Sequence, residues 1–218
     1  MLTLVATPIG RYDEITLRAI ELLKSADILI CESTKETSKL LKHFEIKAKK
    51  YEVLDEHSTP EDLKALVEMC ATQNVCLVSD CGTPAFCDPG NNLILLCRQK
   101  NIPVATALGA SSLMGILSLS SERIKRFQFI GFLPAENVAR EKEWSLVKKI
   151  KEPFVLMDTP YRLKKLLEEC KTHLPDRKML LALNLSQDNE MILEGSPKSI
   201  HSKLKLEKAE FMILIYSA

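Results

Sequence analysis

The first half of the chain alternates short, continuously apolar runs with longer segments in which apolar residues recur every three or four positions. The short runs predict buried strands and the longer segments predict helices. Strands are expected at 2–6, 27–31, 75–79 and 102–106, and helices at 15–26, 34–44, 59–72 and 92–100. Apolar strands separated by helices of about ten to fifteen residues are typical of βαβ units. We therefore predict a parallel sheet that is covered on both faces.

The second half has fewer helical patterns, and its strand-like runs lie closer together. Its patterned segments are 127–134, 154–160, 161–174, 178–186, 190–195, 196–205 and 210–218. The small, apolar, helix-compatible stretch 107–121 predicts a hinge, and the polar stretch 134–144 predicts a mobile loop or a short exposed helix. The predicted fold is therefore α/β with two lobes: residues 1–110 with a parallel sheet and residues 111–218 with a mixed sheet.

Composition narrows the classes of function. The 218 residues include 30 Lys or Arg and 29 Asp or Glu, which gives a net charge of +1. No global basicity indicates nucleic-acid binding, although a local patch is compatible with it. No apolar run approaches the ~20 residues that cross a bilayer. The first residues lack a basic start and include an acidic residue at position 13, so we expect no signal peptide and a cytoplasmic location.

Seven cysteines are present, at positions 31, 70, 76, 81, 87, 97 and 170. Without a secretory signal, reduced and mostly buried thiols are expected rather than a disulfide framework. The spacing from Cys76 to Cys97 lacks the close pairs that are typical of zinc and iron–sulfur sites, so no metal is predicted. Cys81 and Cys87 are expected to be small, reduced filler.

Three turn-rich loops follow predicted strands: ATPIGRYDEIT, VSDCGTPAFCDPG and TALGASS. Ligands of open α/β sheets bind at the carboxyl ends of the strands. The fingerprints of dinucleotide and triphosphate loops are absent. Asp80 and Asp88 offer carboxylates for an ammonium or hydroxyl group, and Thr83 and Ser111 offer hydroxyls, which suits a zwitterionic, nucleoside-like ligand. The alternative is an ordinary turn, in which the same residue types are common.

The same stretches carry a resemblance to a known family. The segments TLVATPIGRYDEITLRAIELLKSADILICEST, LVSDCGTPAFCDPG, IPVATALGASSLMGILSLS and FQFIGFLP occur in the order seen in the tetrapyrrole methylase superfamily. The chain is most similar to the branch of small-subunit ribosomal RNA (cytidine-2′-O)-methyltransferases, over essentially all 218 residues. The resemblance implies two α/β lobes, S-adenosylmethionine in the cleft between them, a homodimer and no metal.

The resemblance also implies which residues bind the cofactor. Pro8 and Gly10 match a first cofactor-side loop, and Gly109 matches the small-residue turn entering the second lobe. The implied cofactor-binding residues are Pro8, Asp80, Gly82, Thr83, Pro84 and Ser111.

A ribose hydroxyl is a poor nucleophile at neutral pH, so a nearby base is expected. Glu32 and Asp158 each lie at the carboxyl end of a predicted strand, where carboxylates often face a site. The third candidate, His57, has a plainer alternative as a solvated or capping loop histidine. By the resemblance, Glu32 and His57 match polar positions near the substrate, Asp158 stands where the branch has Glu, and Tyr161 stands where it has His.

The chain departs from the branch mainly at polar motifs. P-I-G-N-L appears as PIGRY, E-D-T-R-H-T appears as ESTKET, and A-R-E-L-T-K appears as ALNLSQDN at 182–189, without Arg or Lys. The loop after GFLP is more acidic, and longer members of the branch continue beyond the strand FMILIYSA. Lys and Arg contacts to phosphate supply most non-specific RNA affinity. The loss of these residues bears on the RNA substrate more than on the methyltransferase activity. Ribosomal RNA remains the first prediction for the substrate, because position-specific RNA contacts can rest on shape and backbone amides. The alternatives are a methyltransferase acting on another RNA, a protein or a small molecule, and a non-catalytic cofactor-binding paralogue.

Overall fold

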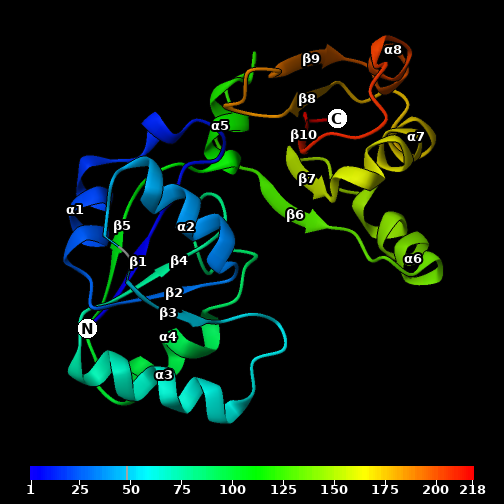
Figure 1. The fold of residues 1–218 in the computed structure, drawn as a ribbon. Helices are drawn as coiled ribbons and strands as arrows, with labels where there is room; N and C mark the ends of the chain where they lie inside the picture. Colours follow the sequence, from blue (N-terminus) through cyan, green and yellow to red (C-terminus); the bar gives the residue numbers. More distant parts are fainter. Residues whose placement is uncertain (48) are drawn as a thin grey trace. The chain divides into compact units, whose positions relative to one another are not determined.

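The structure is a computed structural model that describes residues 1–47 and 49–218. The chain divides into two compact units, Met1–Ser111 (unit 1) and Ser112–Ala218 (unit 2). Each unit contains one five-stranded sheet with helices packed on it (Figure 1).

The sheet of unit 1 is parallel throughout, in the order β3-β2-β4-β1-β5. Its strands are β1 (Leu2–Val5), β2 (Ile28–Cys31), β3 (Lys50–Val53), β4 (Val75–Val78) and β5 (Val104–Ala107). In the register, Leu2 lies opposite both Val75 and Val104. The predicted parallel sheet is confirmed, and all five carboxyl ends consequently lie at one edge.

Helices cover both faces of this sheet, which explains why its central strands are apolar at every position except Thr3 of β1. They are α1 (Leu17–Ser25), α2 (Thr34–His43), α3 (Pro60–Thr72) and α4 (Asn91–Gln99). Alternate residues of each strand pack in opposite directions: Ile30 joins the core beneath α3 and α4, whereas Leu29 joins the core beneath α1 and α2.

Local capping fixes where α3 begins. Thr59 Oγ1 accepts a hydrogen bond from the Asp62 backbone nitrogen at 3.2 Å, and Asp62 Oδ2 accepts one from the Thr59 nitrogen at 2.9 Å. Pro60 occupies the first helical position, where its missing N–H leaves no bond unmade. The side chains of Thr16 and Ser33 cap α1 and α2 in a similar way.

Unit 2 has a mixed sheet in the order β6-β7-β10-β8-β9. Its strands are β6 (Gln128–Phe132), β7 (Phe154–Asp158), β8 (Met179–Leu183), β9 (Met191–Gly195) and β10 (Phe211–Ile215). β6 and β7 are parallel, and the other neighbours are antiparallel, as the sequence predicts. The helices are α5 (Ser112–Ser118), α6 (Asn137–Val147), α7 (Leu163–His173) and α8 (Pro197–Lys203).

The register of unit 2 gathers four chain segments at one edge of its sheet. Phe211 lies opposite both Asp158 and Leu183, and Met191 lies opposite Leu183. The carboxyl ends of β7 and β8 therefore meet the amino ends of β9 and β10, and the carboxyl end of β6 reaches the same edge.

Two sequence expectations need correction. The stretch 134–144 is neither a mobile loop nor a fully exposed helix, because Arg140 and Trp144 of α6 are buried. Cys81 and Cys87 are exposed, so they do not fill interior space, whereas the other five cysteines are buried. Within residues 1–47 and 49–218, every helix is too short or too polar to cross a bilayer.

Candidate active site

The loops that follow β1, β4 and β5 are joined to one another by hydrogen bonds. Thr7 and Gly82 exchange backbone hydrogen bonds of 2.9 and 3.1 Å. The Ser79 hydroxyl donates to the Gly82 carbonyl at 3.2 Å, and Thr83 Oγ1 donates to the Ala110 carbonyl at 3.1 Å. The loops therefore form one connected structure at the carboxyl edge of the unit 1 sheet.

Glycine is required at two positions of this structure for different reasons. Gly82 has a φ of +78°, in the left-handed region that other residues rarely adopt. A Cβ at Gly109 would lie 2.9 Å from the Ala6 Cβ, so the loop after β5 approaches β1 too closely for a side chain. Ala85 and Cys87 also adopt positive φ angles, of 62° and 66°. Such conformations cost on the order of 1 kcal/mol each and are concentrated at functional sites.

Two hollows lie at this edge within unit 1. The smaller, of about 190 Å³, is lined by Thr7, Pro8, Ile9, Gly10, Tyr12, Glu36, Thr37, Leu40, Ser79 and Asp80. The larger, of about 550 Å³, is lined by the carboxyl ends of β2 and β3 and by residues 87–93. The larger one includes four carboxylates, those of Glu32, Asp55, Glu56 and Asp88.

Burial and neighbouring negative charges raise the pKa values of Glu32 and Asp88 in this hollow. Burial, and then the charges of Glu32 and Asp80, raise the pKa of Asp88 to about 6. Burial, and then the charges of Asp80, Glu56 and Asp55, raise the pKa of Glu32. Burial also raises the pKa of Asp80, although a hydrogen bond from the Ser33 nitrogen at 3.2 Å opposes that shift. Among the described residues, no Lys or Arg pairs with Glu32, Asp80 or Asp88.

His57 lies in the exposed loop after β3. Its backbone nitrogen donates to Asp55 Oδ1 at 2.9 Å, and its ring Nε2 lies 3.6 Å from Glu56 Oε1. The side chain is 84% exposed. This placement fits the plainer expectation of a solvated loop histidine, although the loop borders the acidic hollow.

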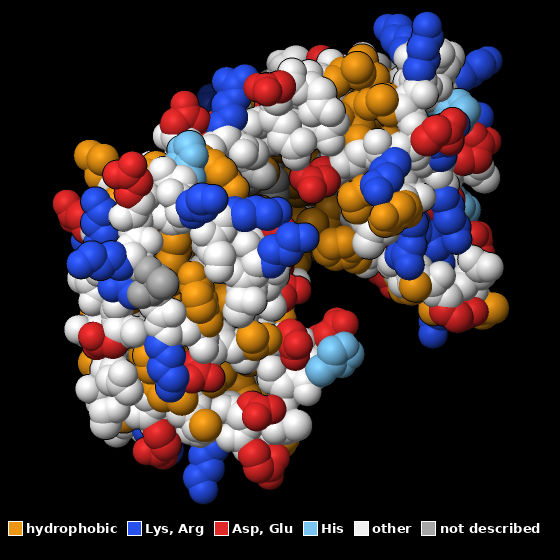
Figure 2. All heavy atoms as spheres, in the orientation of Figure 1, with side chains coloured by type: hydrophobic (Ala, Val, Ile, Leu, Met, Phe, Trp, Pro, Cys, Tyr) orange, Lys and Arg blue, Asp and Glu red, His pale blue; other side chains and the backbone are white. Residues whose placement is uncertain are grey.

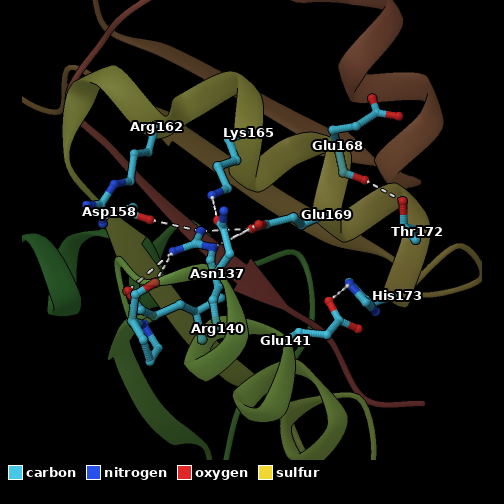
Figure 3. A network of polar contacts seen from close by, with 12 residues as sticks. Asn137, Arg140, Glu141, Asp158, Arg162, Lys165, Glu168, Glu169, Thr172 and His173 are labelled. Carbon is cyan, nitrogen blue, oxygen red and sulfur yellow. Dashed lines mark hydrogen bonds and ion pairs between the residues drawn. The ribbon is translucent and has the colours of Figure 1, made fainter.

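Asp158 has very different surroundings in unit 2. Its fully buried carboxylate accepts hydrogen bonds from Arg140 Nη2 at 3.0 Å, Arg162 Nη1 at 3.2 Å and the Thr159 nitrogen at 2.8 Å. Arg140 also donates to both oxygens of Glu169 (Figure 3). Two guanidinium groups pair with the Asp158 carboxylate, and burial separates it from solvent. This is the geometry of a structural ion pair rather than that of a base.

The structure thus brings most of the predicted site residues together within one unit. Glu32, His57 and the six predicted cofactor-binding residues lie in unit 1, and only Asp158 lies in unit 2. Asp88 was expected to contact a ligand but not to serve as a proton acceptor. Its pKa is raised first by burial and then by the charges of Glu32 and Asp80, which lie in loops far from each other in the sequence.

The family comparison decides the class of chemistry. A sequence model of the family described as Tetrapyrrole (Corrin/Porphyrin) Methylases matches residues 1–200. The chain belongs to this family. It is an S-adenosylmethionine-dependent methyltransferase, and the resemblance noted from its motifs is confirmed.

Curated relatives are similar along nearly the whole chain. A protein from Synechocystis sp., named ribosomal RNA small subunit methyltransferase I, is 33% identical over 100% of this chain and 79% of its own length. Proteins of the same name from Halalkalibacterium halodurans and Rickettsia prowazekii are each 34% identical over 98% of this chain, and over 75% and 77% of their own lengths.

Solved structures share the fold at lower identity. A diphthine synthase superimposes with a TM-score of 0.71 at 15% identity, covering 99% of this chain and 89% of that one. The methyltransferase CobJ gives 0.70 at 13% identity, covering 100% and 94%. A uroporphyrin-III C-methyltransferase from Thermus thermophilus, in complex with S-adenosyl homocysteine, gives 0.65 at 17%, covering 98% and 96%.

The carboxylates at the loops of unit 1 fit the chemistry of S-adenosylmethionine. The cofactor carries an ammonium group, a sulfonium and ribose hydroxyls, which are cationic or hydrogen-bond-donating. The carboxylates of Glu32, Asp80 and Asp88 lack cationic partners among the described residues, so they are available to such groups. Glycine at positions 82 and 109 keeps the linked loops free of side chains at these two points.

Proposed function

We propose that this methyltransferase methylates the ribose 2′-hydroxyl of a cytidine in small-subunit ribosomal RNA. The observation that carries the proposal is identity of 33–34% to proteins named ribosomal RNA small subunit methyltransferase I, over 98–100% of the chain. The methylated atom and base are inferred from the motif resemblance. The enzyme would act in the cytoplasm, where small ribosomal subunits are assembled.

The linked loops of unit 1 would hold the cofactor. Asp80 offers an acceptor for its ammonium or ribose hydroxyl groups, and the Thr83 hydroxyl ties the loop after β4 to the loop after β5. Pro8, Gly82, Pro84 and Ser111 would set the shape of the three loops around the ligand. When bound, S-adenosylmethionine supplies an electrophilic methyl group on its sulfonium.

Glu32 is the proposed general base. A base works best when its pKa lies near the working pH, because it is then both deprotonated and proton-accepting. Burial and the neighbouring charges of Asp80, Glu56 and Asp55 move the pKa of Glu32 upward in this direction. Asp88, with a pKa of about 6, is a second proton acceptor beside it. His57 would assist from its exposed loop, and Asp158 would hold Arg140 and Arg162 in place.

The proposal is tested by incubating the purified protein with isotope-labelled S-adenosylmethionine and isolated small ribosomal subunits, followed by nucleoside mass spectrometry. We expect 2′-O-methylcytidine to form. Glu32→Gln should lower kcat by about 100-fold, which is the low end of general-base contributions, while binding of S-adenosylhomocysteine changes little. Asp13→Asn, in the exposed turn Tyr12–Glu14, is a control carboxylate in unit 1.

Cofactor binding without transfer to small subunits would overturn the ribosomal assignment. Transfer to another RNA, a protein or a small molecule would then identify the substrate class. Absence of transfer to any of them would indicate a cofactor-binding paralogue.

We also propose that the enzyme is a homodimer that needs no metal. Sedimentation velocity should give twice the mass of 24.6 kDa, and dialysis against a chelator should leave methyl transfer unchanged. A monomeric mass would remove the dimer from the proposal without affecting the activity.

A further inference from the structure

An exposed aromatic ring and three cations occupy one edge of the unit 2 sheet. We call Tyr161, Arg162, Lys205 and Lys208 the Tyr161 surface. Tyr161 and Arg162 belong to the 3-10 turn Pro160–Arg162, directly after β7, and Lys208 precedes β10. Because Asp158 and Phe211 are paired neighbours in the sheet, these two segments lie side by side.

Tyr161 is exposed to a degree that packing does not explain. Its side chain is 77% exposed, whereas most large aromatic residues of folded proteins are largely buried. Lys208 Nζ lies 4.0 Å from the centroid of its ring, so an ammonium group covers one face. The exposure leaves the rest of the ring available to a flat partner.

Among the described residues, Lys205 and Lys208 make no ion pair, whereas Arg162 pairs with the buried Asp158 and remains partly exposed. Arg162 is anchored through Nη1 to Asp158 at 3.2 Å, while its side chain stays 33% exposed. Lys205 is exposed and makes no ion pair with any described residue. The alternation of Leu204 and Leu206, which pack on the core, with Lys205 directs this lysine outward.

The positive charge is local. Residues 161–165 and 203–208 each contain three Lys or Arg, and Glu207 is the single acidic residue within these two segments. The whole chain, by contrast, has a net charge of only +1. Glu207 pairs with Lys164. Figure 2 shows Lys and Arg side chains over α7 and α8, with Asp and Glu side chains among them. By contrast, residues 184–190 at the same edge contain no Lys or Arg.

We propose that the Tyr161 surface binds single-stranded RNA, with one base stacked on Tyr161 and the flanking phosphates bound by Arg162, Lys205 and Lys208. An aromatic platform beside a cationic track is how proteins bind unpaired strands, because every base has a face to stack and every linkage has a charge. An acidic polypeptide would satisfy the cations but would leave the ring without a partner. The inference rests on the proposed function in taking this RNA to be the enzyme's substrate.

The direct test is fluorescence anisotropy with the full-length protein and a labelled, unstructured RNA of 12 nucleotides, a length within the usual range of ~4–16 nucleotides per binding site. Tyr161→Ala should weaken binding about tenfold. Tyr161→Phe should bind within about twofold of the wild type, because it keeps the ring face. Lys205→Ala and Lys208→Ala should each reduce the slope of log Kd against log salt by about one.

Matched controls come from the opposite edge of the same sheet. Phe127, 37% exposed, and the exposed Lys125 immediately precede β6, which runs parallel to β7. Phe127→Ala and Lys125→Ala should leave RNA binding unchanged. Trp144, the single tryptophan, is buried in unit 2 and reports by its fluorescence whether each of these variants is folded there.

Three results would overturn the inference. They are wild-type affinity in Tyr161→Ala, an equal loss in Phe127→Ala, and competition by polyglutamate as strong as that by RNA, which would indicate an acidic protein partner. Failure of the proposed function is separable, because this binding assay needs neither cofactor nor methyl transfer. If Tyr161→Ala methylates small subunits with an unchanged KM, the surface is excluded while the function stands. If RNA binding depends on Tyr161 but small subunits are not methylated, the Tyr161 surface stands and the proposed function fails.

Discussion

Glu32 of unit 1 and Asp158 of unit 2 occupy equivalent places in the chain but have opposite surroundings. Each lies at the carboxyl end of a buried strand. Glu32 faces the charges of Asp80, Glu56 and Asp55 with no cation paired to it in the described structure. Asp158 is held by two arginines and a backbone amide. A carboxylate at a strand end is therefore not a site by position alone; its partners decide what it does.

The difference separates stability from function. In unit 2 the buried carboxylates are neutralised, so the network binds α6, β7 and α7 together. In unit 1 the carboxylates repel one another, which disfavours the folded state at neutral pH but keeps proton acceptors available. Natural proteins tolerate this kind of destabilisation where a ligand or substrate uses it.

The largest expected effect comes from breaking the buried ion-pair network of unit 2. Burial lowers the pKa of the Arg140 guanidinium, but hydrogen bonds to Glu169 and Asp158 outweigh burial and raise it. Arg140→Met should reduce the free energy of unfolding of unit 2 by about 3–5 kcal/mol, because Asp158 loses its buried partner. Urea unfolding followed by Trp144 fluorescence measures this loss. Lys171→Met, which breaks the exposed pair with Glu168, should change it by less than about 0.5 kcal/mol. A similar effect in both variants would contradict the assigned difference.

The next effect concerns the loops of unit 1. Thr83→Tyr places a bulky ring in the loop that Thr83 ties to Ala110, and should weaken S-adenosylhomocysteine binding at least ~30-fold, or about 2 kcal/mol. Unfolding should remain cooperative because residue 83 is exposed. Thr83→Ser keeps the hydroxyl and should bind within about threefold of the wild type. Isothermal titration calorimetry measures both. Unchanged affinity in Thr83→Tyr would mean that this loop is only a turn.

Asp88 should make the stability of unit 1 depend on pH. Its pKa rises from the ordinary 3.8 to about 6 on folding, so the folded state takes up a proton. The contribution of this proton uptake to the free energy of unfolding is fully present below pH ~3.8 and is lost as the pH rises through ~6. Asp88→Asn stays neutral, so we expect it to be more stable than the wild type by about 1–2 kcal/mol at pH 8, after discounting for partial exposure, and similar to it near pH 4.

Asp62 provides a control of opposite sign. Hydrogen bonds from the Thr59 backbone and hydroxyl lower the pKa of Asp62, so its contribution is present above pH ~3.8 and is lost in acid. Asp62→Asn should therefore destabilise unit 1 at pH 8. Circular dichroism during thermal unfolding at the two pH values follows both variants. A pH-independent difference for Asp88→Asn would show that its carboxyl is not strained by its neighbours.

Much of the fold could be predicted from the sequence because strands covered on both faces are apolar at nearly every position. β3 was missed since its residues KYEV lie at the sheet edge and are only partly buried. The sequence pattern did not predict the buried face of α6, because Arg140 counts as a polar residue. In the structure Arg140 is buried, and its charge is paired with Glu169 and Asp158.

The site was predictable only as far as strand order allows. Loops after parallel strands must gather at one edge, which placed Asp80 and Thr83 correctly beside the loops after β1 and β5. Whether Glu32 and Asp158 are neutralised depends on Asp80 and Arg140, which come close only in the folded chain. No spacing rule predicts such partners.

The smallest effect concerns backbone strain in the loop after β4. Ala85 has a φ of 62°, a left-handed conformation that costs an L-residue about 1–2 kcal/mol, of which the flexibility of glycine in the unfolded chain offsets roughly half. Ala85→Gly should therefore stabilise unit 1 by about 0.5 kcal/mol. The matched control is Asn101→Gly, at a φ of 56° just after α4, where asparagine already tolerates this conformation and little change is expected. Chemical unfolding followed by circular dichroism compares the two variants. If the loop is held in this conformation for the ligand, Ala85→Gly should also weaken S-adenosylhomocysteine binding about twofold, whereas Asn101→Gly should not; equal behaviour of the two variants would mean that the strain at Ala85 serves only the turn.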